Sequence, residues 1–194
     1  MSSRTVEQFR ETKETSIRLT LDLDGNYREI DTGLPFFDHM LTSLAFHGQI
    51  GLKIEAQGDL DVDEHHLVED VGIVLGDALH AAVETYGPVM RFGSAAVPMD
   101  EALSEAVVDV SGRPYLVYTA DYPQDYCGKF PIAMLNEFFY ALAHHAGITL
   151  HAHCRYGHNS HHMAEALFKA VGRAFLQAYA PRSGPGPAST KGVL

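Results

Sequence analysis

The chain has 194 residues, of which 46% are hydrophobic and 20% charged, the balance of a globular protein with one core or two small halves. Its formal net charge of −11 argues against a nucleic acid or an anionic membrane as partner, because both bind basic surfaces. No apolar run approaches the ~20 residues that span a bilayer, and the N-terminus lacks an apolar signal core. With Cys127 and Cys154 expected to be reduced thiols, we predict a cytoplasmic protein.

The first half is predicted to contain two strands, a helix, a strand and a long helix. Residues 16–23 alternate apolar and polar side chains, which predicts a half-buried strand. The turn signal at residues 24–26 predicts that residues 27–32 return as its hairpin partner. The remaining elements are a helix from Pro35 to about Gly48, a strand over 50–56 and a helix from about Asp63 to Tyr86.

The second half repeats this order. The stretches AVVDVS (106–111) and YLVYTA (115–120) flank Gly112-Arg113-Pro114, which predicts a second hairpin. A helix over about 132–145, a strand over 148–154 and a helix over about 160–179 follow. Three prolines, at positions 181, 185 and 187, then end regular structure before the tail.

The two halves can be aligned. LAFHGQIGLKI (44–54) matches LAHHAGITLHA (142–152) at an offset of 98, and HHLVE (65–69) matches HHMAE (161–165) at an offset of 96. This self-similarity predicts an α+β protein built by duplication, each half packing helices on a sheet. We place the halves at residues 1–92 and 93–181, followed by a tail over 182–194, and expect them to function as one domain.

The repeated HHxxE pattern predicts a metal centre. Positions i and i+4 share one face of a helix, so His65 lies beside Glu69, and His161 beside Glu165. The second histidine of each pair is turned by about 100° and should serve a different ion. The alignment adds one matched helix position per half, His39 in the first and Glu137 in the second. The eight candidate ligands are His39, His65, His66, Glu69, Glu137, His161, His162 and Glu165.

Pseudo-twofold symmetry divides these ligands into two sets of four. We assign one ion to His39, His66, His161 and Glu165, and the other to His65, Glu69, Glu137 and His162. A set of nitrogen and oxygen ligands without thiolate disfavours structural zinc and suits manganese, iron or another six-coordinate divalent ion.

Other polar residues have ordinary interpretations on their own. Glu14 is interpreted as a solvated acid, Arg91 and Arg113 as turn arginines, Asp100 as a turn or cap residue, and Ser189 and Lys191 as part of a frayed tail.

Several stretches together resemble the imidazoleglycerol-phosphate dehydratase family. The resemblance covers nearly the whole chain and is carried by LPFFDHML (34–41), DVDEHHLVED (61–70), PMDEAL (98–103), SGRPYL (111–116), GHNSHHMAEALFKA (157–170) and STKGVL (189–194). It implies two duplicated ribosomal-protein-S5 domain-2-like halves, each a small mixed or antiparallel sheet with two helices.

The resemblance also implies a reaction and roles for residues. The reaction is the manganese-dependent dehydration of D-erythro-imidazole glycerol phosphate to imidazole acetol phosphate in L-histidine biosynthesis, with two Mn²⁺ ions per active site. Glu14 is implied as the proton-transferring residue. Arg91, Arg113, Ser189 and Lys191 are implied as ligands of the substrate phosphate, and we include Asp100 among the candidate substrate-binding residues.

The resemblance further implies a homo-oligomer of 24 subunits built from trimers, with active sites at subunit interfaces. Two positions depart from the family pattern: Glu137 stands where many members have His, and Ser43 where some have Gln. The chain has no room for the phosphatase domain fused to some members, so we expect a single activity.

Two other functions compete with this one. A two-metal phosphohydrolase would use the same ions to activate water and would release phosphate. A non-catalytic metal-storage oligomer would bind metal without turnover.

Overall fold

The computed structural model describes residues 3–182, so the predicted phosphate ligands Ser189 and Lys191 lie outside the described residues. In chain order the elements are β1 (Thr5–Glu11), β2 (Thr15–Asp22), β3 (Arg28–Asp31), α1 (Pro35–Gly48), β4 (Gly51–Gly58), α2 (His65–Tyr86), β5 (Phe92–Met99), β6 (Ala102–Val110), β7 (Tyr115–Thr119), β8 (Tyr126–Cys127), β9 (Phe130–Pro131), α3 (Met134–Ala146), β10 (Ile148–Tyr156) and α4 (Ser160–Ala178).

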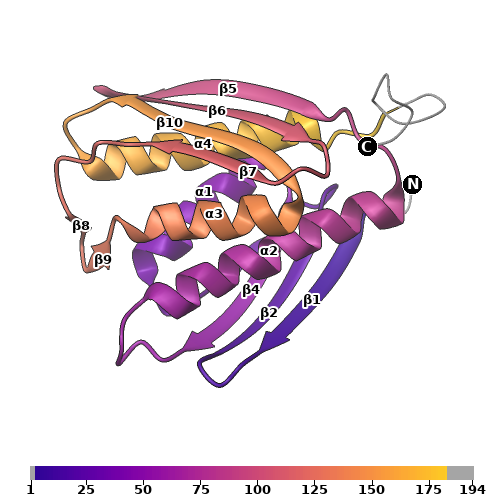
Figure 1. The fold of residues 1–194 in the computed structure, drawn as a ribbon, viewed down its shortest axis with the longest axis horizontal. Helices are drawn as coiled ribbons and strands as arrows, with labels where there is room; N and C mark the ends of the chain where they lie inside the picture. The colour runs from indigo at the N-terminus through magenta and orange to yellow at the C-terminus, as the bar shows by residue number, and fades with distance from the viewer. Residues whose placement is uncertain (1–2, 183–194) are drawn as a thin grey trace.

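The helices lie in a layer between two four-stranded sheets (Figure 1). Helix α2 packs on β1 and β2, whereas α4 packs on β5 and β6. The helices also pack in pairs, α1 against α4 and α2 against α3, so each pair joins the two halves. Apolar side chains of both sheets and all four helices form one core, which confirms the α+β class. Among residues 3–182, no helix combines the length and hydropathy needed to cross a membrane.

The duplication predicted from the sequence is confirmed by the topology. The strand orders β1-β2-β4-β3 and β5-β6-β10-β7 are the same once the halves are superposed in sequence order. The C-cap residue that follows α1 is Gln49, with φ of 51°, and the one that follows α3 is Gly147, with φ of 64°, at the predicted offset of 98 residues. Both caps donate to the carbonyls three and four residues earlier, so the two chain reversals are built alike.

The two predicted hairpins are wrong. Strand β3 pairs parallel with β4 and not with β2, and β7 pairs parallel with β10 and not with β6. In each half, a helix crosses over between the two strands of the parallel pair, which a tight turn could not connect. Both edges of β2 are already occupied, by β4 and by β1. The strands β1 and β5 had not been predicted.

Two glycines allow the helix pairs to approach closely. A Cβ at Gly172 in α4 would overlap the carbonyl oxygen of Leu44 and lie 2.9 Å from the backbone nitrogen of Gly48 in α1. Gly76 in α2, 96 residues earlier, would meet the carbonyl of Leu142 and the backbone nitrogen of Ala146 in α3, each at 2.9 Å. A glycine in close contact with the backbone of the partner helix is therefore present in both helix pairs that join the halves.

Substituting Gly172→Ala is expected to destabilise the fold by about 1–3 kcal/mol, because the methyl group meets backbone atoms that cannot move aside. The gain in helix propensity of about 1 kcal/mol only partly offsets this overlap. Thermal unfolding monitored by circular dichroism would measure the effect. As a control, Glu84→Ala, at an exposed position on α2, should change the free energy of unfolding by less than about 0.5 kcal/mol. A Gly172→Ala protein as stable as the parent would contradict the close packing.

Candidate metal centre

Three predicted ligands meet where α1 packs on α4. The Nε2 atoms of His39 and His161 each lie 3.1 Å from Oε2 of Glu165. The candidate ligand atoms of these residues all lie within 4.8 Å of one another, and no other set of three His, Cys, Asp or Glu side chains in the described part of the chain does so. The structure thus brings together the i, i+4 pair of α4 and the matched position on α1, whereas the role of these residues as metal ligands stays a prediction.

The carboxylate of Glu165 is buried and held in its charged form. Burial acts to raise the pKa of Glu165, but hydrogen bonds from Lys169 and His39 outweigh it and lower the pKa to about 2. Lys169 lies one turn further along α4, with Nζ 2.8 Å from Glu165 Oε1. Sequence reasoning missed Lys169, although its i, i+4 spacing from Glu165 was the available signal. The ionised Glu165 beside two imidazoles is a donor set that fits a divalent cation.

The matching group in the first half is more open. Nε2 of His65 lies 3.9 Å from Oε2 of Glu69, and both side chains are about 41% exposed. Glu137 occupies the position on α3 that corresponds to His39 on α1, and α3 packs on α2, which carries the other two residues. Its Oε1 accepts a hydrogen bond from Nδ2 of Asn136 at 3.2 Å. The ligand atoms of Glu137, His65 and Glu69 do not all lie within 4.8 Å of one another, as those of the first group do.

The second histidine of each pair faces carboxylates at a sheet end. Nδ1 of His66 lies 3.1 Å from Oδ2 of Asp59 and 3.8 Å from Oε2 of Glu14. Nδ1 of His162 lies 2.8 Å from Oε2 of Glu101. The hydrogen bond from His162 is the largest influence lowering the pKa of Glu101 to about 2. Within one chain, therefore, His66 is not in the group formed by His39, His161 and Glu165, with which it was predicted to share an ion. Likewise, His162 does not form such a group with His65 and Glu69.

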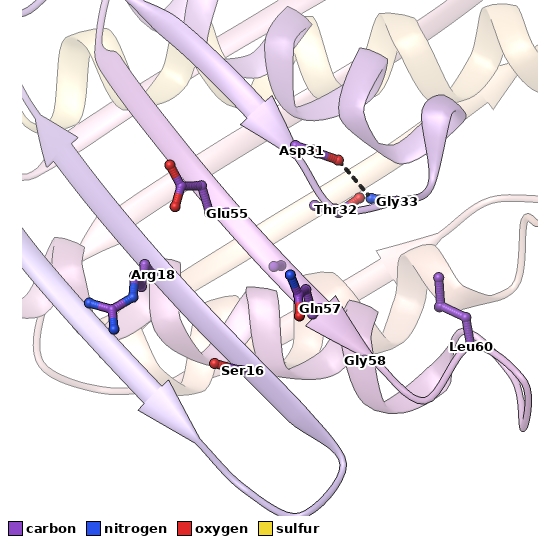
Figure 2. A pocket seen from close by; sticks show the side chains of 10 residues that line it. Ser16, Arg18, Asp31, Thr32, Gly33, Glu55, Gln57, Gly58 and Leu60 are labelled. Atoms are coloured by element: carbon purple, nitrogen blue, oxygen red, sulfur yellow. Dashed lines mark hydrogen bonds between the residues drawn. The ribbon is translucent and has the colours of Figure 1, made fainter.

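The predicted base Glu14 lies in the turn between β1 and β2, and its side chain is 54% exposed. Glu14 and Asp59 border a hollow of about 350 Å³. That hollow shares Ser16, Gln57 and Gly58 with a second one of about 690 Å³ on the outer face of the first sheet (Figure 2). On the α4 side, His161 borders another hollow of about 350 Å³, so a ligand has room beside this residue of the candidate centre.

Two of the predicted phosphate ligands lie close together. Nε and a terminal nitrogen of Arg91 donate to the two carboxylate oxygens of Asp109 at 2.6 and 3.1 Å, and a terminal nitrogen of Arg113 lies 3.8 Å from the same carboxylate. Arg91 has a φ of 78°, and Asp100 has a φ of 46° in the turn between β5 and β6. Asp100 is therefore a turn residue, as its surroundings in the sequence indicated. Sequence reasoning missed Asp109, because an acid on a strand gives no signal of the arginine that it contacts.

The fold and these contacts define a duplicated α+β protein whose helices present a candidate metal centre of imidazole and carboxylate ligands. Residues 32–175 match the family model described as imidazoleglycerol-phosphate dehydratase. The chain belongs to this family, and it is accordingly an enzyme of the hydro-lyase class.

Relatives and solved structures agree with this assignment. The imidazoleglycerol-phosphate dehydratase of Halorhodospira halophila is 50% identical over the full length of both chains. That of Pelobacter propionicus is 51% identical over 99% of this chain and 100% of its own. The crystal structure of the enzyme from Staphylococcus aureus superposes with a TM-score of 0.84 at 37% identity, covering 92% of this chain and 99% of its own. The crystal structure of the enzyme from Pyrococcus furiosus, in complex with (S)-C348, superposes with a TM-score of 0.84 at 38% identity. It covers 96% of this chain and 100% of its own.

Proposed function

We propose that this protein dehydrates D-erythro-imidazole glycerol phosphate to imidazole acetol phosphate in L-histidine biosynthesis, using two Mn²⁺ ions per active site. The observation that carries the proposal is the group of His39, His161 and Glu165, assembled at the helix positions that the repeat predicted. Relatives about 50% identical over their whole length bear the name of this activity. A cytoplasmic location is part of the proposal and is supported by the two free cysteines.

The proposed ligand sets remain those of the sequence prediction. One ion would be held by His39, His66, His161 and Glu165, and the other by His65, Glu69, Glu137 and His162. When bound, such cations would act as Lewis acids that favour the imidazolate form of the substrate ring. The absence of thiolate among the eight ligands and the ionised state of Glu165 support a cation such as Mn²⁺.

Glu14 is proposed to move the proton. The hydroxyl group leaves the carbon attached to the imidazole ring and a proton leaves the next carbon, so that the two together account for the water released. The enol that remains converts to the ketone. A base is needed at that second carbon. The exposed carboxylate of Glu14, at the edge of a hollow and 3.8 Å from a proposed ligand, supports this role.

Arg91 and Arg113 are proposed to bind the substrate phosphate, together with Ser189 and Lys191. Asp100 stays a proposed substrate-binding residue. The Asp109 carboxylate holds the guanidinium of Arg91 through two hydrogen bonds and lies within 4 Å of Arg113. Guanidinium groups suit a phosphate, and they would allow a protein of net charge −11 to hold an anion.

The active site is proposed to be shared between subunits of a 24-subunit particle built from trimers. Within one chain, His66 and His162 lie with Asp59 and Glu101, whereas their proposed partner ligands lie elsewhere on the helices. A second copy of the chain that presented its His66 to the His39 group would complete a four-ligand set.

The function is tested by assaying the purified protein with imidazole glycerol phosphate, with and without Mn²⁺, while following ketone and inorganic phosphate together. Ketone without phosphate, dependent on Mn²⁺, is the expected result. Phosphate release would identify a phosphohydrolase, and metal binding without turnover would identify a storage protein; either result would overturn the proposal.

The ligand partition predicts that His65→Ala and His66→Ala impair different metal sites. Neighbouring side chains on α2 diverge by about 100°, so they cannot serve the same ion. Metal analysis of each variant, with anomalous scattering from crystals, would show which ion is lost. If both substitutions empty the same site and leave the other filled, the partition is wrong.

A further inference from the structure

The duplication gives the proposed base Glu14 a counterpart in the second half. In the first sheet Ile17 pairs with Ala56, and in the second sheet Ser104 pairs with Cys154. Ala56 and Cys154 are related by the offset of 98 residues, so Ile17 corresponds to Ser104. Counting back three residues along each strand makes Glu14 the counterpart of Glu101.

The two glutamates occupy the same place relative to the paired histidines. Glu101 contacts His162, and Glu14 lies near His66, which is the residue equivalent to His162 in the first half. Their hydrogen bonding differs. Oε1 of Glu101 accepts from the backbone nitrogens of His158 and Asn159, both at 2.9 Å, and Oε2 accepts from Nδ1 of His162. Both oxygens of Glu101 are therefore committed, ahead of the first turn of α4.

In the first half, the carboxylate that contacts Nδ1 of the second histidine is Asp59, and not the counterpart of Glu101. Asp59, in the loop between β4 and α2, places both oxygens within 3.2 Å of Nδ1 of His66. The carboxylate of Glu14 stays 3.8 Å from the same nitrogen. Glu14 is thereby left able to exchange a proton with a substrate, while its counterpart Glu101 is fixed.

We propose that Glu101 and Asp59 are positioning residues that hold the Nδ1–H of His162 and His66, so that Nε2 of each imidazole is the metal-ligating atom. A carboxylate accepts hydrogen bonds and donates none, which fixes the tautomer with the proton on Nδ1 and the lone pair on Nε2. The proposal rests on the proposed function, because it takes His66 and His162 as ligands of the catalytic metals.

The contacts predict different effects for two amide substitutions. In Glu101→Gln, the amide oxygen is required by the two backbone N–H groups ahead of α4. The amide nitrogen must then face Nδ1 of His162, and a donor there favours the tautomer whose proton sits on Nε2. That tautomer has no lone pair on Nε2 with which to bind a cation. In Asp59→Asn, the side-chain oxygen is free to turn toward His66, so the correct tautomer survives.

The test is a Mn²⁺ titration of the assembled full-length protein, with unbound Mn²⁺ measured by its room-temperature EPR signal. Glu101→Gln should weaken one class of site by about 10–100-fold and leave the other class unchanged, with normal circular dichroism. Asp59→Asn should weaken binding by less than about threefold, whereas Asp59→Ala, which removes the acceptor, should approach the effect of Glu101→Gln.

Asp77→Asn is the matched control. Oδ1 of Asp77 lies 2.9 Å from Nδ1 of His145, which is the same contact on a histidine that is not a proposed ligand. It should leave Mn²⁺ affinity unchanged. His162→Gln distinguishes a failure of the positioning role from a failure of the proposed ligand set. If His162→Gln loses a site but Glu101→Gln binds Mn²⁺ like the parent, the positioning role is refuted. If His162→Gln also binds like the parent, the proposed ligand set itself is wrong.

Discussion

Glu14→Gln is expected to lower kcat by about 10²–10⁴-fold while the fold and metal content are retained. The amide has the shape of the carboxylate but cannot accept the proton that leaves the substrate carbon. The side chain is 54% exposed and lies in the turn between β1 and β2, so the substitution disturbs no packed core. Steady-state kinetics with imidazole glycerol phosphate, together with metal analysis, would measure both quantities.

The comparison for this result is Glu7→Gln, which removes an exposed acid from β1 in the same β-hairpin. Its kcat should stay within about twofold of the parent, since surface substitutions of this kind rarely matter. Near-normal turnover by a metal-replete Glu14→Gln protein would exclude Glu14 as the base. A fall in KM without a fall in kcat would also exclude it, because general-base removal acts on the chemical step.

The periodic part of the fold could be predicted from the sequence. Pro35 and Gly48 bound α1 as their residue types indicated, and the apolar stripe of the following long helix gave α2 to within two residues. These features could be predicted because each depends on residues close together in the chain.

Strand pairing could not be predicted in the same way. The turn signal at residues 24–26 is real, since Gly25 donates to Asp22 there, but it does not decide which strand comes next in the sheet. That choice depends on β1, whose apolar residues Val6 and Phe9 do not alternate regularly, and on the crossover through α1. Pairing is a long-range property, and an irregular edge strand conceals it from a periodicity argument.

The candidate site shows the same division. The meeting of His39, His161 and Glu165 could be predicted because helix geometry is local and the repeat shows which position of the earlier helix matches. Asp59, Glu101 and Asp109 were missed, since an acid in a turn or on an outward strand position resembles any solvated acid. Each becomes informative only when folding brings it beside His66, His162 or Arg91. Carboxylates that act through another side chain are thus the part of a site that a single sequence conceals most.

Metal binding and assembly of the subunits are expected to be coupled. Within one chain His39, His161 and Glu165 already converge, whereas His66 and His162 hold their Nδ1 atoms on carboxylates at the sheet ends. If these two histidines complete the metal sites of neighbouring copies, each bound ion ties subunits together. An ion that binds only the assembled state stabilises that state by mass action. Assembly and metal content should therefore rise and fall together.

Removal of Mn²⁺ is expected to convert the proposed 24-subunit particle to trimers, a roughly eightfold fall in mass, and addition of Mn²⁺ should rebuild it. Light scattering coupled to size-exclusion chromatography, at equal protein concentration with and without metal, would measure the change. Ca²⁺, which takes longer bonds to oxygen and suits imidazole poorly, should restore the particle far less well at the same concentration. A fully active monomer at any metal level would refute sites shared between subunits. A 24-subunit particle that persists without bound metal would show that contacts other than the ions hold it together.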